Sequence, residues 1–164
     1  LKRERELQRQ RILTENRQLE KDNDRKSKAL ADSTLNLARK NEMLLNLREE
    51  LNKMYRSSTT GTVHHQRLLH LIDHHLSSEE DWAIFESHFN EVHAAFLKRL
   101  REKHPHLTSG DLKLAAYLRM ELSSKKIAPL LHISVRGVEN KRYRLRKKLG
   151  LEGADNLNNY LITF

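Results

Sequence analysis

The sequence predicts an all-α protein with an N-terminal coiled-coil helix, a helical platform and a C-terminal domain of four helices. Three observations support this fold class. The 164 residues include only five Gly and two Pro, and residues 1–56 contain neither. Apolar residues recur at helical spacing along most of the chain. Only 37% of residues are hydrophobic and 32% are charged, which suits a long solvated helix joined to a smaller globular part.

Residues 1–56 form the predicted coiled-coil helix, in which four leucines recur every seven residues: Leu30, Leu37, Leu44 and Leu51. Two heptad registers fit. With the leucines at position a, position d holds Ile12, Leu19, Lys26, Ser33, Lys40, Leu47 and Met54. With the leucines at position d, position a holds Thr34, Asn41, Arg48 and Tyr55. A helix this polar buries too little apolar surface alone, so it needs a second copy or another domain. We expect a homodimer in which the four leucines form the dimer contact.

Residues 62–106 form the predicted platform, after a linker of small hydroxyl residues around Gly61. One helix is expected over Val63–Leu76. Ser78 and Asp81 then predict the capped start of a second helix. We expect this helix to run unbroken and to dominate the core through one stripe: Trp82, Phe85, Phe89, Val92, Phe96 and Leu100.

Residues 64–93 hold seven of the ten histidines. His70 and His74 lie four residues apart, as metal ligands can, but no carboxylate stands at ligand spacing. We therefore interpret these histidines as surface or interface residues and expect no metal.

Residues 107–164 form the predicted C-terminal domain. Capping residues start its helices: Thr108 with Asp111, then Ser123 with Ser124, then Ser134. The helices that follow are expected over Lys125–Leu131 and Val135–Leu149, the latter stopped by Gly150, and over about 155–163.

Positive charge gathers in this domain. The net charge of the chain is +9, and the segment from Lys125 to Lys148 holds nine basic residues against the single acid Glu139. Helix 135–149 is two-sided, with Val138, Leu145 and Leu149 on its apolar side. A short helix, a three-residue turn and a longer basic helix make the helix-turn-helix arrangement that reads a DNA major groove.

The exposed side chains of this arrangement predict the DNA contacts. Base-reading residues carry hydrogen-bonding groups on the side opposite the apolar stripe: Arg136, Glu139, Asn140 and Tyr143. Phosphate-contacting residues carry positive charge: Lys125, Lys126, Lys141, Arg144 and Lys147.

The pattern Thr108…Asp111…Lys126-Ile-Ala128…Leu131…Ile133-Ser134…Val138…Lys148-Leu149-Gly150 resembles the LuxR/GerE-type four-helix DNA-binding domain. Residues 62–164 also look like the C-terminal region of Bacteroidetes regulators with a triple-tyrosine (Y_Y_Y) domain. This resemblance implies an upstream sensor domain and a cytoplasmic chain whose full-length protein is anchored in the inner membrane, with Leu1 just inside it. Gly137, Lys141, Pro129 and Glu139 depart from the family pattern, which puts the operator sequence in doubt rather than the binding mode.

The expected function is therefore that of a dimeric, sequence-specific transcription regulator that binds double-stranded DNA. The alternative is a coiled-coil scaffold whose basic helix binds anionic lipid or an acidic partner. An RNA-binding module is disfavoured because Tyr143 is the only aromatic residue in the basic segment. The chain has no Cys and no nucleotide-binding, hydrolase or metalloprotease motif, so we expect no enzyme activity, cofactor or small-molecule substrate.

Overall fold

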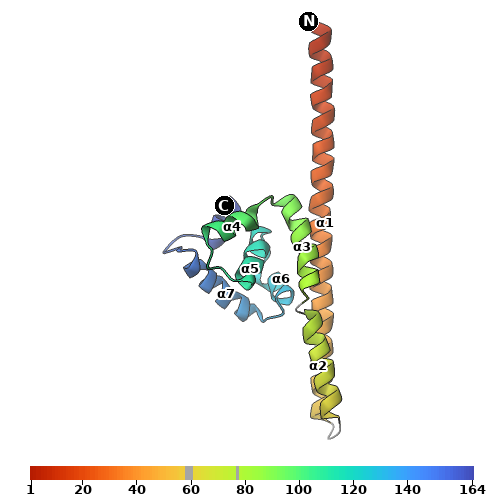
Figure 1. The fold of residues 1–164 in the computed structure, drawn as a ribbon, viewed down its shortest axis with the longest axis vertical. Helices are drawn as coiled ribbons and strands as arrows, with labels where there is room; N and C mark the ends of the chain where they lie inside the picture. Colours follow the sequence, from red (N-terminus) through yellow and green to blue (C-terminus); the bar gives the residue numbers. More distant parts are fainter. Residues whose placement is uncertain (58–60, 77) are drawn as a thin grey trace.

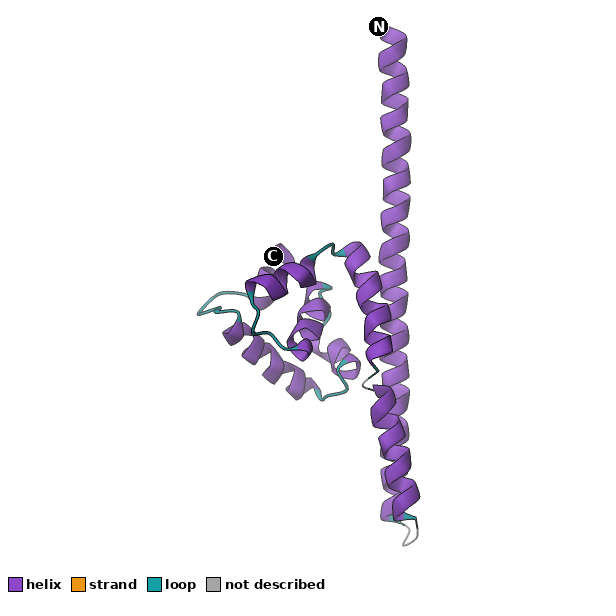
Figure 2. Ribbon diagram, viewed as in Figure 1, coloured by secondary structure: helices purple, strands orange, loops and turns teal. Residues whose placement is uncertain are grey.

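The computed structural model describes residues 1–57, 61–76 and 78–164, and these residues form helices and connecting loops, as predicted (Figure 2). Helix α1 (Lys2–Arg56) is a long rod, and α2 (Thr62–Leu76) and α3 (Glu79–Val92) run back along its C-terminal half (Figure 1). Five further helices form a group on one side of this rod: α4 (Phe96–Lys103), α5 (Ser109–Arg119), α6 (Ser124–Leu130), α7 (Val135–Lys148) and α8 (Leu157–Thr163).

The C-terminal half of α1 buries Thr34 and Asn41 of the second heptad register, whereas Arg48 of that register is half-buried and Tyr55 is exposed. Leu30, Thr34 and Asn41 are buried within the same chain, whereas Leu47 and Met54 of the first register are exposed. The four leucines assigned to a dimer contact are instead covered to different degrees by their own chain: Leu30 is buried, and Leu37, Leu44 and Leu51 are half-buried. A partner joined through a short loop loses less entropy on pairing than a second copy, and α2 and α3 are such partners. Residues 58–60 of the predicted linker lie outside the described residues.

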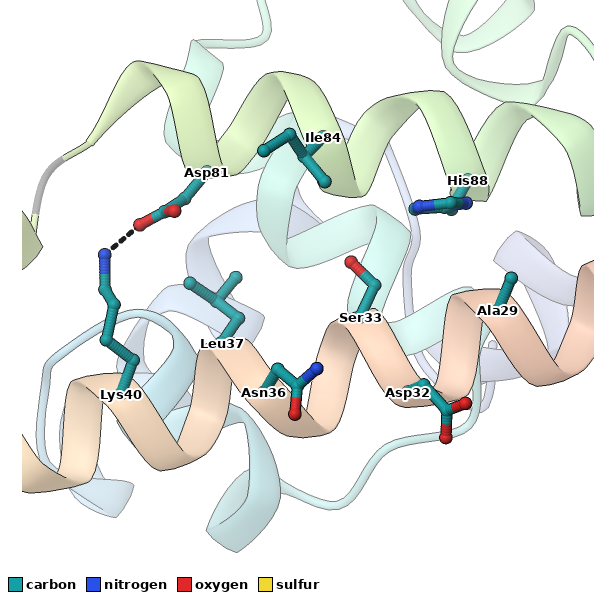
Figure 3. Close-up of a pocket in the computed structure, with 9 residues that line it drawn as sticks. All are labelled: Ala29, Asp32, Ser33, Asn36, Leu37, Lys40, Asp81, Ile84 and His88. Carbon is teal, nitrogen blue, oxygen red and sulfur yellow. Dashed lines mark hydrogen bonds and ion pairs between the residues drawn. The ribbon is translucent and has the colours of Figure 1, made fainter.

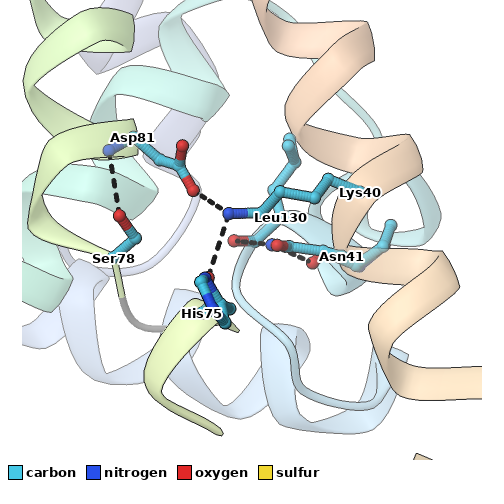
Figure 4. Close-up of polar contacts among 7 residues, drawn as sticks. Lys40, Asn41, His75, Ser78, Asp81 and Leu130 are labelled. Atoms are coloured by element: carbon cyan, nitrogen blue, oxygen red, sulfur yellow. Dashed lines mark hydrogen bonds and ion pairs between the residues drawn. The ribbon is translucent and has the colours of Figure 1, made fainter. Parts of the chain in front are cut away.

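Polar contacts fix α1 to three other helices (Figure 4). The Lys40 ammonium group binds the Asp81 carboxylate of α3 and donates to the carbonyl of His75, at 3.0 Å, in α2. The Asn41 amide donates to the carbonyl of Pro129 in α6 at 2.9 Å, and to that of Leu130 at 3.3 Å. The long rod is therefore attached to the C-terminal group of helices through α6 as well as through α3.

The prediction of one unbroken helix through Trp82 and Leu100 was wrong. Helix α3 ends at Val92 and α4 begins at Phe96, because Ala95 adopts a left-handed conformation with φ of 59°. The break turns both halves of the aromatic stripe toward the same core, where the Phe89 and Phe96 rings lie 5.9 Å apart. A straight helix of this length would carry Phe96 and Leu100 past the core they fill.

The core itself matches the predicted stripe. Phe85, Phe89, Phe96 and Leu100 are fully buried, and Trp82 packs against them partly exposed. Helix α5 adds Tyr117, whose ring lies 5.0 Å from that of Phe85. The Thr108–Asp111 capping box at the start of α5 is present, with 3.2 Å from the Asp111 N–H to Thr108 Oγ1.

The N-terminal part of α1 extends away from the rest of the chain (Figure 1). Residues 1–21 are exposed throughout, over about 30 Å at ~1.5 Å per residue. Among the helices of the described residues, none has a stretch apolar and long enough to span a bilayer.

Candidate nucleic-acid interface

Helix α7 is two-sided as the sequence predicts. Ser134 caps its start by accepting from the N–H of Gly137 at 3.0 Å, and Gly150, with φ of 71°, follows its end. Val138 and Leu145 are fully buried against the core. The opposite side therefore faces solvent over the whole length of the helix.

That solvent-facing side presents Arg136, Asn140, Tyr143 and Lys147 in steps of four, three and four residues. All four are exposed, and the Lys147 ammonium group lies 4.7 Å from the centroid of the Tyr143 ring. A row at this spacing lies along one line of a helix. Donors in such a row can reach successive base edges, and the lysine adds positive charge at its C-terminal end.

Glu139 lies beside this row but is bound by its own chain. Its carboxylate accepts a hydrogen bond from the Ser124 hydroxyl at the first residue of α6. The contact joins the N-terminal end of α6 to α7. It also takes up part of the acceptor capacity that base reading by Glu139 would use.

Three basic residues of α7, Arg142, Arg146 and Lys148, bind other parts of the same chain. Arg146 donates to the carbonyls of Gly153, at 2.6 Å, and Asp155, so it holds the segment that leads into α8. Arg142 donates to Asn158 Oδ1, at 3.3 Å, in the first turn of α8. The Lys148 ammonium group lies 2.6 Å from the Asp111 carboxylate at the start of α5.

The contacts of Asp111 are strong enough to affect its titration. Partial burial disfavours its charged form, but hydrogen bonds from Lys148 and Thr108 outweigh this and lower the pKa of the carboxyl. The position of the three basic residues on the flanks of α7 does not mark them as structural, because Lys141, which is exposed, lies equally near the apolar side.

Helix α6 braces α7 from behind. Ile127, Ala128 and Leu130 are buried, and the Ser123 hydroxyl caps the helix at 3.3 Å from the N–H of Lys126. Lys125 and Lys126 are exposed on its first turn. The two phosphate-contacting lysines predicted outside α7 therefore stand on the helix that packs against it.

The turn between α6 and α7 is tight. His132 adopts a left-handed conformation with φ of 46°. A Cβ at Gly137 would lie 3.3 Å from Ile133 Cβ, closer than most contacts of this kind. Glycine at 137 therefore lets α7 begin close against the turn.

The remaining predicted residues also lie at the surface. Arg144 and Lys141 are exposed on one flank of α7, and Lys141 Nζ lies 3.8 Å from where a Cβ on Gly110 would stand. The structure thus places all nine predicted DNA-contacting residues at the surface, seven on α7 and two on α6. Their roles in DNA contact stay predictions.

No cluster of three or more potential metal ligands occurs within the described part of the chain. Comparisons of the chain with protein-family models, with curated proteins and with solved structures gave no match.

Proposed function

We propose that this protein is a dimeric, sequence-specific transcription regulator that inserts α7 into the major groove of double-stranded DNA. The observation that carries the proposal is the division of α7 into two sides: a buried apolar side and an exposed row of Arg136, Asn140, Tyr143 and Lys147. The major groove admits one helix, and α7, with 14 residues, spans about 21 Å at ~1.5 Å per residue.

The packing of α6 behind α7 supports the same proposal. A recognition helix has to be held rigidly while its outer side stays open. Here α6 packs behind α7, while Arg142, Arg146 and Lys148 bind neighbouring segments from its flanks. The resemblance of residues 107–163 to LuxR/GerE-type domains agrees with this assignment.

Binding to anionic lipid, the alternative function, is less well supported. A helix that lies in a membrane surface carries a broad exposed apolar face. The large hydrophobic residues that α7 exposes are Val135 and Tyr143 alone.

A salt titration tests the proposal. A preferred duplex is first selected from a randomised DNA library, and its affinity is then measured by fluorescence anisotropy at increasing salt. Because α6 and α7 together bring several cations to each half-site, we expect affinity to fall about a thousandfold between about 50 and 200 mM salt. A salt-independent affinity, or no selected duplex, contradicts the proposal.

Matched variants assign the roles within α7. Lys147→Ala should weaken binding to all duplexes about equally, whereas Asn140→Ala should relax the preference at one base pair. Lys98→Ala removes an exposed cation of α4 and serves as the control, with unchanged affinity expected.

A further inference from the structure

Helix α1 and the two helices packed along it, α2 and α3, together form a thicker rod. The side of this rod opposite the C-terminal helices carries none of the DNA-contacting residues. A groove of about 410 Å³ runs between α1 and α3 on this side, and all of its lining residues come from these two helices. Figure 3 looks onto the groove, with α1 and α3 in front and the C-terminal helices behind. This side is therefore open to a partner that leaves α7 uncovered.

Exposed apolar side chains continue from the groove along α1. Asn36 and Lys40 line the groove, and Met43, Leu47 and Met54 follow in steps of three, four and seven residues, which keeps them on the same side of the helix. These last three residues are exposed, although they are large and apolar.

Helices α2 and α3 add apolar residues to the same side. Ile84 lines the groove from α3 and is about half exposed. On α2, Leu68 and Leu71 are exposed, and at ~100° per residue both lie on the same edge of the helix, to one side of the buried contact made by Ile72 and Leu76. Because α2 runs antiparallel to α1, helical geometry turns this edge to the side of Leu47.

We infer that this side, formed by Met43, Leu47, Met54, Leu68, Leu71 and Ile84, is the homodimer interface, and that a second copy of the chain covers it. We call it the rod face. The inference deepens the proposed function, which requires two copies. It also replaces the leucine contact predicted from sequence, because the chain itself covers those leucines to different degrees.

The size of the rod face fits a second copy. From Ala29 to Met54 the two-helix layer is about 39 Å long at ~1.5 Å per residue, and two helices side by side are about 20 Å wide. The resulting area of about 800 Å² matches what each partner contributes to a standard protein interface. Two such layers packed face to face form a four-helix bundle.

The charges at the edge of the rod face fit a two-fold axis parallel to the helices. Such an axis lays each α1 over α2 and α3 of the second copy. The Lys40–Asp81 contact places Arg39 level with the start of α3, near Glu80, and His88 faces Ala29, which places Lys28 level with Glu91. All four of these charged residues are exposed. Across the axis, the cations of one copy lie level with the carboxylates of the other.

Three matched substitutions on α1 test the interface by analytical ultracentrifugation without DNA. Leu47, Leu35 and Ile12 are 50%, 48% and 51% exposed, so a glutamate at any of them leaves the packing of the chain intact. We expect the wild type to be a dimer. Leu47→Glu should raise the dimer Kd about a hundredfold or more, because the dimer buries one carboxylate from each copy.

Leu35→Glu should weaken the dimer much less than Leu47→Glu, because Leu35 lies in line with Lys28 and Arg39 at the outer edge of the rod face. Ile12→Glu should leave the dimer unchanged, since Ile12 lies on the exposed N-terminal part of α1. Circular dichroism checks that all variants are equally helical, and Leu71→Glu repeats the test from α2. A monomeric wild type, a dimer insensitive to Leu47→Glu and Leu71→Glu, or dissociation by Ile12→Glu overturns the inference. An intact, sensitive dimer that binds no DNA overturns only the proposed function.

Discussion

Asn41 shows how one residue joins parts of the chain that lie far apart in sequence. Its side chain is buried, and its amide donates to the carbonyls of Pro129 and Leu130 at the end of α6. The Pro129 carbonyl also accepts from the N–H of His132, whereas no residue of α6 follows Leu130 to bind its carbonyl. The Asn41 Oδ1 has no hydrogen-bond partner among the described residues. From sequence alone Asn41 was a candidate a position in one of two registers. The structure uses it instead as a cap for a helix 88 residues further on.

Replacing Asn41 tests this cap. Asn41→Asp removes the donor and places a buried carboxylate against two carbonyl oxygens, so we expect a loss of about 3 kcal/mol in the free energy of unfolding at neutral pH, measured by urea denaturation. Asn46→Asp, an exposed position on the same helix, is the control and should change stability by less than about 0.5 kcal/mol. Equal stability of the two variants would show that the cap contributes nothing.

At the scale of elements, the sequence predicted the helices well where local signals set them. The starts of α3, α5, α6 and α7 follow capping residues, and Gly150 marks the end of α7. The break before α4 could not be predicted, because Ala94 and Ala95 favour helix and the stripe continues through them. The register of α1 could not be predicted either, since the heptad pattern does not reveal that α2 and α3 fold back onto it.

In the candidate interface, too, the sequence predicted the exposed side of α7 but not the partners of its side chains. Periodicity predicted which side of α7 is exposed, because Val138 and Leu145 mark the buried side without tertiary information. It did not separate Arg142 and Arg146 from Arg144, because their partners are backbone carbonyls of the segment that leads into α8 and the Asn158 side chain of α8 itself.

The helix break predicts an unusual stabilising substitution. Ala95 has a φ of 59°, a conformation that glycine adopts without strain, so Ala95→Gly should raise the free energy of unfolding by about 0.5–1 kcal/mol. If the stripe formed one continuous helix, the same substitution would lower stability by about 1 kcal/mol. The sign of the change in urea denaturation decides between them. Ala94→Gly is the control, and it should give no gain.

At the scale of the whole molecule, three partly buried histidines, His93, His104 and His132, couple folding to pH. Burial lowers the pKa of His93, His104 and His132 from the ordinary value of 6.5, with nearby cations adding to the effect. His132 also has a buried Nδ1 without a partner among the described residues. In each case the unfolded chain binds the proton more readily than the folded one.

Stability should therefore fall as the pH drops below about 6.5. The folded pKa values are lowered, so their contribution is complete above the unfolded value and is lost as the pH falls through the folded one. We expect a lower urea midpoint at about pH 5.5 than at about pH 7.5, at matched ionic strength. His132→Gln should reduce this difference. A midpoint that is constant over this range contradicts the assignment.

The continuity of α1 has a consequence for anything attached upstream. One uninterrupted helix connects the exposed residues 1–21 to Asn41, which hydrogen-bonds α6. Each residue along this helix turns the chain by about 100° and advances it by ~1.5 Å. The number of residues between an attached body and Asn41 thus sets the direction in which that body points around the axis of α1, relative to α6. Seven added residues restore that direction to within about 20°, whereas two added residues carry the body to the opposite side. The number of residues in the exposed N-terminal part of α1 therefore determines how an attached body is rotated relative to α6.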